Sequence, residues 1–143
     1  MRLPILVAPA PRLYEHSLVV HGITTEIEKL AQDMLETLYA AQGLGLSAVQ
    51  VGRSECVAVI DIGQGPEILI NPVILDHSRM SICEEGCLSV PDVIVRKPRW
   101  LRVTYRACRL DGTWYETQAE DLFAIVLQHE IDHLNGSVRR SAR

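Results

Sequence analysis

The sequence lacks any apolar run approaching the roughly 20 residues that span a bilayer, which argues against a membrane protein. It also lacks internal repeats, low-complexity segments and any composition shift that would mark a linker. Its 143 residues are 48% hydrophobic, enough to bury about 70% of the unfolded surface and too many for a disordered chain. We therefore expect one folded domain over residues 1–143.

An excess of basic residues is missing as well. The net charge is −4 and the pI is near 5.7, whereas nucleic-acid-binding domains are usually basic. A short basic end holds Arg139, Arg140 and Arg143, which we interpret as a solvated tail and not as a contact with ribosomal RNA. The sequence thus favours no specific nucleic acid as a partner.

No signal peptide is expected at the N-terminus, because Pro4, Pro9 and Pro11 break the apolar stretch that a signal needs. No two of the four cysteines form a CxxC pair, which argues against a zinc ribbon or a thioredoxin motif. We therefore expect a cytoplasmic protein whose cysteines are reduced. Each would then be a small buried side chain or a metal ligand.

Two helices are predicted from hydrophobic periodicity. Over residues 24–41 the apolar side chains recur every 3.6 residues. Thr24 or Thr25 can cap this helix, and Gly43 can end it. The same period returns over residues 119–134, where an Asn-Gly pair follows as the stop signal.

Strand patterns fill the chain between these helices. Extended segments are predicted at residues 56–62, 67–75, 81–90 and 100–110, and Asp111-Gly112 signals a hairpin turn into a return strand. This order fits an α+β fold and not a βαβ alternation. We expect mixed or antiparallel β-sheets packed around the last helix as a central helix, together with the N-terminal helix.

The last predicted helix carries the segment QHEIDH. His129 and His133 are four residues apart, so they share one helix face. Both imidazoles can then reach one ion at about 2.1 Å. Glu130 can take a proton from a water on that ion, as in H-E-x-x-H enzymes. The alternative is that both histidines face solvent, but the surrounding helix is apolar, which favours a metal site.

The third metal ligand must lie upstream. A catalytic site usually has three protein ligands, and the ten residues after His133 include no His, Cys, Asp or Glu. Cys87 is the best of several candidates, because a thiolate is a strong ligand and Gly86 permits a close backbone approach. Without the HEIDH motif elsewhere in the sequence, Cys87 would be interpreted as a buried core cysteine. Because the motif is present, we interpret Cys87 as a metal ligand.

Three segments together resemble the peptide deformylase family, whose signature is GxGLAAxQ, then EGCLS, then QHExDH. This chain reads GLGLSAVQ (Gly43–Gln50), EGCLS (Glu85–Ser89) and QHEIDH (Gln128–His133) in the same order. An INP element at Ile70–Pro72 and the pair Pro98-Arg99 also fit. Each motif is moderately specific alone, and the ordered set with matching spacing is very specific.

The resemblance implies a metal-dependent hydrolase that removes the formyl group from N-formylmethionyl peptides of nascent chains and releases formate. It implies Fe²⁺ in the cell, with Zn²⁺, Ni²⁺ or Co²⁺ as replacements in purified protein. A metal-bound water would attack the formyl carbon, with Glu130 as general base and then as acid toward the leaving amine. The Leu88 backbone N–H and the Gln50 amide would donate to the oxyanion. Three residues would hold the metal: Cys87, His129 and His133.

The resemblance also implies a methionine pocket, since an unbranched thioether suits a narrow apolar slot. The alternative is that its apolar members are ordinary core. The residues that would bind substrate are Gly43, Leu44, Gly45, Cys83, Glu85, Gly86, Leu122, Ile125 and Val126.

The chain departs from the family pattern in three places. Ser47 replaces the first alanine of the first motif and brings a hydroxyl that needs a partner. Ile94 stands where some bacterial members carry an arginine near the substrate backbone, a role that Arg96 or Lys97 could take. Many members continue into a long C-terminal helix that helps docking on the ribosome. This chain stops after GSVRRSAR, so we expect a short form without that docking element.

Two other functions stay open from the sequence. A non-catalytic, metal-binding relative that binds peptides would agree with Ser47 and Ile94, but would need neither Glu130 nor Gln50. A peptidase that cuts internal bonds would lack its downstream third ligand.

Overall fold

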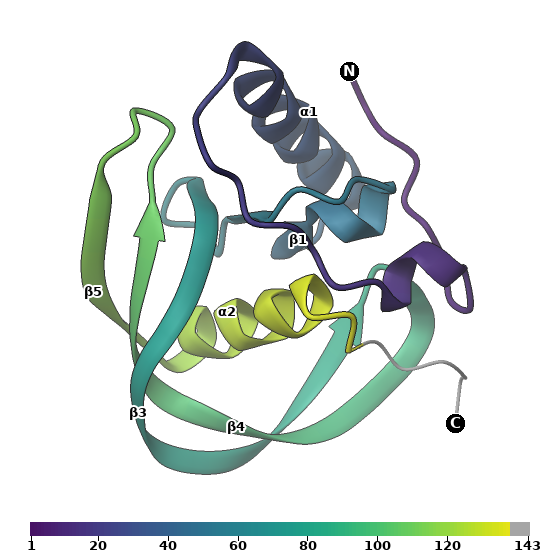
Figure 1. Ribbon diagram of the computed structural model, residues 1–143. Helices are drawn as coiled ribbons and strands as arrows, with labels where there is room; N and C mark the ends of the chain where they lie inside the picture. Colours follow the sequence, from purple (N-terminus) through teal and green to yellow (C-terminus); the bar gives the residue numbers. More distant parts are fainter. Residues whose placement is uncertain (138–143) are drawn as a thin grey trace.

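The computed structural model describes residues 1–137, so the basic residues Arg139, Arg140 and Arg143 lie outside the described part. The fold is α+β, as predicted, with two α-helices and five strands (Figure 1). The described strands form one antiparallel sheet in the order β1-β2-β3-β4-β5, not several sheets. The elements are η1 (Pro11–Tyr14), α1 (Thr25–Ala41), β1 (Gly45–Ser47), η2 (Ala48–Val51), β2 (Val57–Ile60), β3 (Glu67–Cys87), β4 (Val90–Cys108), β5 (Trp114–Glu120) and α2 (Asp121–Leu134).

Helix α1 forms where the periodicity predicts it. Thr24 is the cap, and its side chain accepts a hydrogen bond from the backbone N–H of Ile27 at 3.3 Å. The predicted end at Gly43 is one residue late. Gln42 takes the left-handed conformation, with φ of 56°, and its N–H bonds to the carbonyls of Leu38 and Tyr39. The helix therefore stops without needing a glycine at this position.

Strand β2 is covered on both faces, which explains its continuous apolar sequence. Val57 and Val59 pack into the apolar cluster that includes α1. Ile60 belongs to a second cluster with Leu127 of α2. The strand thus separates the two helices and holds β1, with the loop before it, against α2.

The two longest strands, β3 and β4, form a hairpin that curls beneath α2 (Figure 1). The segments predicted at 67–75 and 81–90 are parts of one strand, which ends at Cys87, because the chain turns at Leu88 and Ser89. Strand β4 begins at Val90, well before the predicted start at residue 100. Exposed residues and two prolines interrupt the apolar alternation there, so the pattern did not reveal the strand.

Strand β3 bends at the Asn71-Pro72 pair. Asn71 has φ of 53°, and the register with β4 shifts between Ile70 and Val73. The Asn71 side chain accepts from the Val20 N–H at 2.9 Å and donates to the Val20 carbonyl at 2.7 Å. The bend is therefore tied to the chain before α1.

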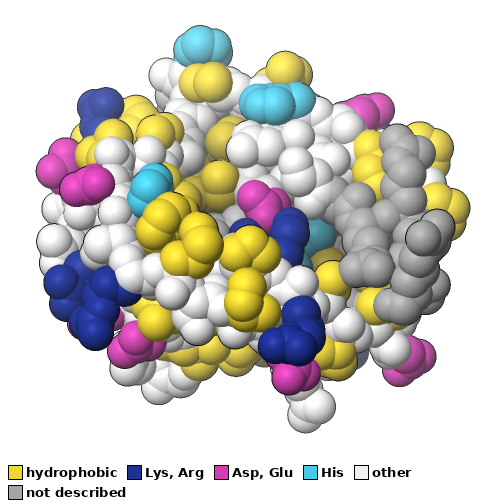
Figure 2. All heavy atoms as spheres, turned by 90° about the horizontal axis from the view of Figure 1, so that it is seen from below, with side chains coloured by type: hydrophobic (Ala, Val, Ile, Leu, Met, Phe, Trp, Pro, Cys, Tyr) yellow, Lys and Arg dark blue, Asp and Glu magenta, His cyan; other side chains and the backbone are white. Residues whose placement is uncertain are grey.

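Helix α2 begins at Asp121, two residues after the predicted start, because Ala119 and Glu120 still pair with β4. Its buried side packs on Val103 and Tyr105 of β4. On the outer face of the hairpin hydrophobic side chains are exposed, and Figure 2 shows them gathered on that side of the molecule. None of the helices among residues 1–137 is long and apolar enough to cross a membrane.

Candidate metal centre and catalytic pocket

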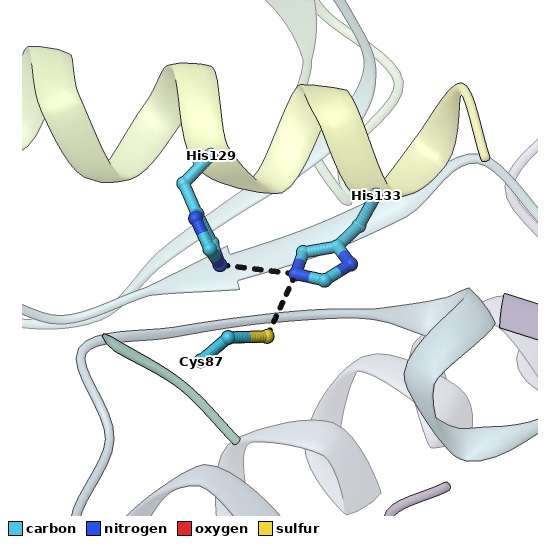
Figure 3. A group of neighbouring side chains, drawn as sticks. All are labelled: Cys87, His129 and His133. Atoms are coloured by element: carbon cyan, nitrogen blue, oxygen red, sulfur yellow. Dashed lines mark hydrogen bonds between the residues drawn. The ribbon is translucent and has the colours of Figure 1, made fainter. Parts of the chain in front are cut away.

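Three side chains from two distant segments meet beneath α2. His129 and His133 extend from consecutive turns of the helix, and Cys87 reaches them from the end of β3 (Figure 3). His133 Nε2 lies 3.0 Å from His129 Nε2 and 3.1 Å from Cys87 Sγ. The ligand atoms of all three residues lie within 4.8 Å of one another. Two imidazole nitrogens and a sulfur fit a transition-metal site that leaves one tetrahedral position open.

His129 is held in the orientation that a metal site needs. Its Nδ1 lies 3.0 Å from Glu85 Oε1, so the Nδ1–H donates there and Nε2 faces the site. Burial lowers the pKa of His129, but hydrogen bonds to Cys87 and Glu85 outweigh it and raise the pKa to about 10, so a metal ion that binds here displaces the Nε2 proton. Arg99 in turn donates two hydrogen bonds to Glu85, from Nε to Oε2 at 2.5 Å and from Nη2 to Oε1 at 2.8 Å. Burial raises the pKa of Glu85, but hydrogen bonds from Arg99 and His129 outweigh it and lower the pKa to about 2. The carboxylate therefore stays ionised beneath the histidine.

His133 is the most buried of the three, with 3% of its surface exposed. Burial and, to a smaller extent, the nearby His129 ring lower the pKa of His133 to about 3. The ring is therefore neutral, the form that binds a metal ion. The His133 ring lines another cavity, of about 360 Å³, together with Lys97 and Arg99.

Glu130 is also 3% exposed, and its Oε1 has no hydrogen-bond partner among the described residues. Burial raises the pKa of Glu130 to about 7, against smaller lowering effects of His129 and the Ser47 hydroxyl. Such a carboxyl can accept and return a proton near neutral pH. A Cβ at Gly45 would lie 2.6 Å from Glu130 Oε2 and 2.8 Å from Val126 Cγ1. Only a glycine there lets β1 pass so close to the acid.

Gln50 lies in η2 with 1% of its surface exposed. Its Nε2 donates to Ser89 Oγ at 3.1 Å and lies 3.9 Å from Cys87 Sγ. Its Oε1 accepts from Ser47. An uncharged donor is thus held beside the predicted metal ligand, where it can reach a developing oxyanion.

These groups border a cavity of about 390 Å³. Most of the residues predicted from the sequence line this cavity, and Gln42 and Glu84 line it as well. The predicted residues that line it are Gly43, Leu44, Gly45, Gln50, Glu85, Gly86, Cys87, Leu88, Leu122, Ile125, Val126, His129 and Glu130. Leu122, Ile125 and Val126 form the apolar wall that the first turns of α2 provide.

Cys83 is not brought into this cavity, although the resemblance implied it. It precedes Glu85 by two positions on β3, and each strand residue adds about 3.3 Å, so its thiol stays further along the hairpin. Cys83 Sγ instead donates to the Ser81 carbonyl at 3.8 Å. Arg96 and Lys97 do not line the cavity either, and Lys97 pairs with Asp132 at 3.3 Å.

Arg99 is the functional residue that the sequence reasoning missed. In the sequence it stands out only as part of a Pro-Arg pair that fits the family, and its ion pairs with Glu85 and Asp132 join residues 14 and 33 positions apart. No local pattern reveals such a pairing. The Ser47–Gln50 contact could have been found, because S-x-x-Q is the spacing of a capping box.

Replacing Arg99 by methionine is expected to lower the free energy of unfolding of the metal-free protein by about 3–5 kcal/mol, because the buried Glu85 carboxylate loses both guanidinium contacts and keeps only the one to His129. Urea unfolding followed by circular dichroism measures this change. The control is Arg102→Met, which breaks the exposed pair with Glu120 and is expected to cost less than about 1 kcal/mol. Equal losses in the two variants would contradict the role assigned to Arg99.

Comparisons with known proteins agree with this geometry. A sequence profile described as polypeptide deformylase matches residues 2–140. A peptide deformylase of Alkalilimnicola ehrlichii is 45% identical over 95% of this chain and 79% of that protein. The peptide deformylase of Thermotoga maritima superposes with a TM-score of 0.94 at 37% identity, covering 96% of this chain and 95% of that one. That of Ehrlichia chaffeensis in complex with actinonin gives 0.93 at 39%, covering 96% and 86%. Matched in sequence and in fold along nearly its whole length, the chain belongs to the polypeptide deformylase family of enzymes.

Proposed function

We propose that the protein removes the N-formyl group from N-formylmethionyl peptides and releases formate. The observation that carries this proposal is the position of Glu130, a buried carboxyl between the Cys87–His129–His133 cluster and an apolar cavity. That arrangement suits hydrolysis of an amide whose acyl part is small and whose amine part carries an apolar side chain.

Cys87, His129 and His133 would hold Fe²⁺ in the cell, or Zn²⁺, Ni²⁺ or Co²⁺ in purified protein. Their mutual reach within 4.8 Å and their thiolate and imidazole chemistry support this assignment. A divalent cation bound there supplies Lewis-acid chemistry, polarising the formyl oxygen and lowering the pKa of water.

The residues of the chain would carry the proton transfers. Glu130 accepts a proton from the water that attacks the formyl carbon, and a tetrahedral oxyanion forms. The Gln50 amide and the Leu88 backbone N–H donate to that oxyanion. Glu130 then returns the proton to the amine nitrogen as the C–N bond breaks, leaving formate and a free amino terminus. The buried, unpaired Oε1 of Glu130 supports this shuttle.

The methionine side chain would enter the cavity along the apolar wall of α2, formed by Leu122, Ile125 and Val126. The substrates are nascent chains, so we place the enzyme in the cytoplasm, near the ribosome. The free state of all four cysteines agrees with such a reducing compartment.

The metal-loaded enzyme is expected to release formate from formyl-Met-Ala-Ser about 50 times more efficiently than from formyl-Ala-Ala-Ser. Methionine adds about three methylene-sized groups at about 0.8 kcal/mol each, or about 2.4 kcal/mol in kcat/KM. Formate release, measured with a coupled formate dehydrogenase, tests this preference. Absence of formate from both peptides would contradict the proposed activity, and equal rates would contradict the methionine pocket.

A further inference from the structure

Ser47 is fully buried and contacts the Gln50 side chain twice. Its backbone N–H donates to Gln50 Oε1 at 2.9 Å, and its hydroxyl donates to the same oxygen at 3.1 Å. An amide oxygen has two lone pairs, and Ser47 provides donors for both when its single hydroxyl proton points to Gln50 and not to Glu130, the other acceptor beside it. An alanine at this position would keep the backbone donor and lose the hydroxyl.

These contacts decide which end of the Gln50 amide faces the metal ligands. A backbone N–H can only donate, so the group facing Ser47 must be the amide oxygen and not the NH₂. The planar amide then directs Nε2 toward Ser89 Oγ, at 3.1 Å, and Cys87 Sγ, at 3.9 Å. Holding the oxygen therefore aims the donor.

We propose that the Ser47 hydroxyl is a positioning residue that holds and polarises the Gln50 amide as an oxyanion donor. The proposal rests on the proposed function, in which Gln50 stabilises the oxyanion. Gln50 is 1% exposed, so water does not readily replace the missing donor when the hydroxyl is removed. The second lone pair of Gln50 Oε1 then accepts no hydrogen bond. The amide group rotates more freely, and its NH₂ donates less strongly.

The kinetic test is a double-mutant cycle on the metal-loaded enzyme with formyl-Met-Ala-Ser as substrate. Ser47→Ala is expected to lower kcat about fivefold, the rate equivalent of one neutral hydrogen bond, with KM and metal content unchanged. Gln50→Ala alone is expected to lower kcat about 10²–10³-fold. In the Gln50→Ala background, adding Ser47→Ala is expected to change nothing further, because the group that it positions is gone.

A fivefold loss that persists in the Gln50→Ala background would overturn the proposal, because the hydroxyl would then act elsewhere, for instance on Glu130. A loss expressed only in KM or in metal content would overturn it as well. Ser17→Ala is the matched control, since Ser17 is another buried serine outside the cavity, and its kcat is expected to match that of the unchanged enzyme.

A second readout does not depend on activity. In the zinc-loaded protein labelled with ¹⁵N-glutamine, the Gln50 NH₂ signals are identified by their absence in Gln50→Ala. Ser47→Ala is expected to shift them and to speed their mutual exchange, while the Gln128 pair, bonded to the Trp100 and Ala124 carbonyls, stays unchanged. Unaltered Gln50 signals would refute the positioning role. If the unchanged enzyme released no formate, the proposed function would fail, and this spectrum would still decide whether Ser47 orients Gln50.

Discussion

Glu130→Gln is expected to lower kcat for formyl-Met-Ala-Ser by about 10²–10⁴-fold, the usual contribution of a positioned general base. Glutamine keeps the shape of the side chain but cannot accept the proton of the attacking water or return it to the amine. The carboxyl lies buried at the cavity, with Oε1 free of partners among the described residues. The metal content of the variant is expected to stay unchanged, because Glu130 is not part of the ligand group.

Steady-state kinetics together with metal analysis measures both expectations for Glu130. The matched control is Glu120→Gln, which removes an exposed glutamate at the end of β5 and is expected to leave kcat within about a factor of two, since exposed pairs contribute little. Full activity of Glu130→Gln would show that another group moves the proton.

Cys87→Ala is expected to weaken metal binding by more than about 100-fold, beyond the 10–100-fold loss that follows removal of an outer-shell partner. Of the three proposed ligands among the described residues, Cys87 alone does not come from α2, so without it two histidines on one helix face remain. Activity is expected to fall with the metal content. Competition with a chromophoric chelator measures the affinity.

Cys83→Ala is the matched control for the Cys87 variant, because Cys83 lies four positions earlier on β3 and outside the cavity. Its metal affinity and kcat are expected to equal those of the unchanged enzyme. Equal metal affinity of the Cys87 and Cys83 variants would contradict the assigned ligand, and a raised KM in the Cys83 variant would restore that residue to the methionine pocket.

Local sequence patterns predicted the elements that depend on local chemistry. Helix α1, with its Thr24 cap, and helix α2 follow from apolar periodicity, and the bend at Asn71 follows from the proline after it. The pattern failed at the tip of the β3–β4 hairpin, where Val90 already pairs with Cys87. Beyond Val90, residues 91–98 are exposed or half-buried, and long-range strand pairing overrides local preference.

In the candidate site, too, local spacing predicts some of the residues, and long-range strand pairing brings the others together. His129 and His133 extend from consecutive turns of α2, so their spacing predicts their shared face, and Glu130 directly follows the first of them. Glu85 and Arg99 meet only because β3 and β4 pair, which no local spacing encodes. Cys83, which the resemblance implied for the methionine pocket, does not line the cavity, although it lies only two positions from Glu85 on β3.

The alternatives left open by the sequence are less well supported by the structure. A peptidase for internal bonds has no support in the family match, and the third ligand group comes from β3, upstream of α2. A non-catalytic relative is disfavoured because the matched proteins are named as enzymes. The hydroxyl of Ser47, which raised that doubt, has a partner in Gln50.

Anomalous scattering from crystals of the nickel-loaded protein, recorded on both sides of the nickel absorption edge, tests the metal centre most directly. We expect one strong peak enclosed by Cys87 Sγ and the Nε2 atoms of His129 and His133, with its remaining coordination position open toward Glu130. A peak elsewhere, or a Cys87 sulfur turned away from both rings, would contradict the proposed centre and the hydrolysis built on it.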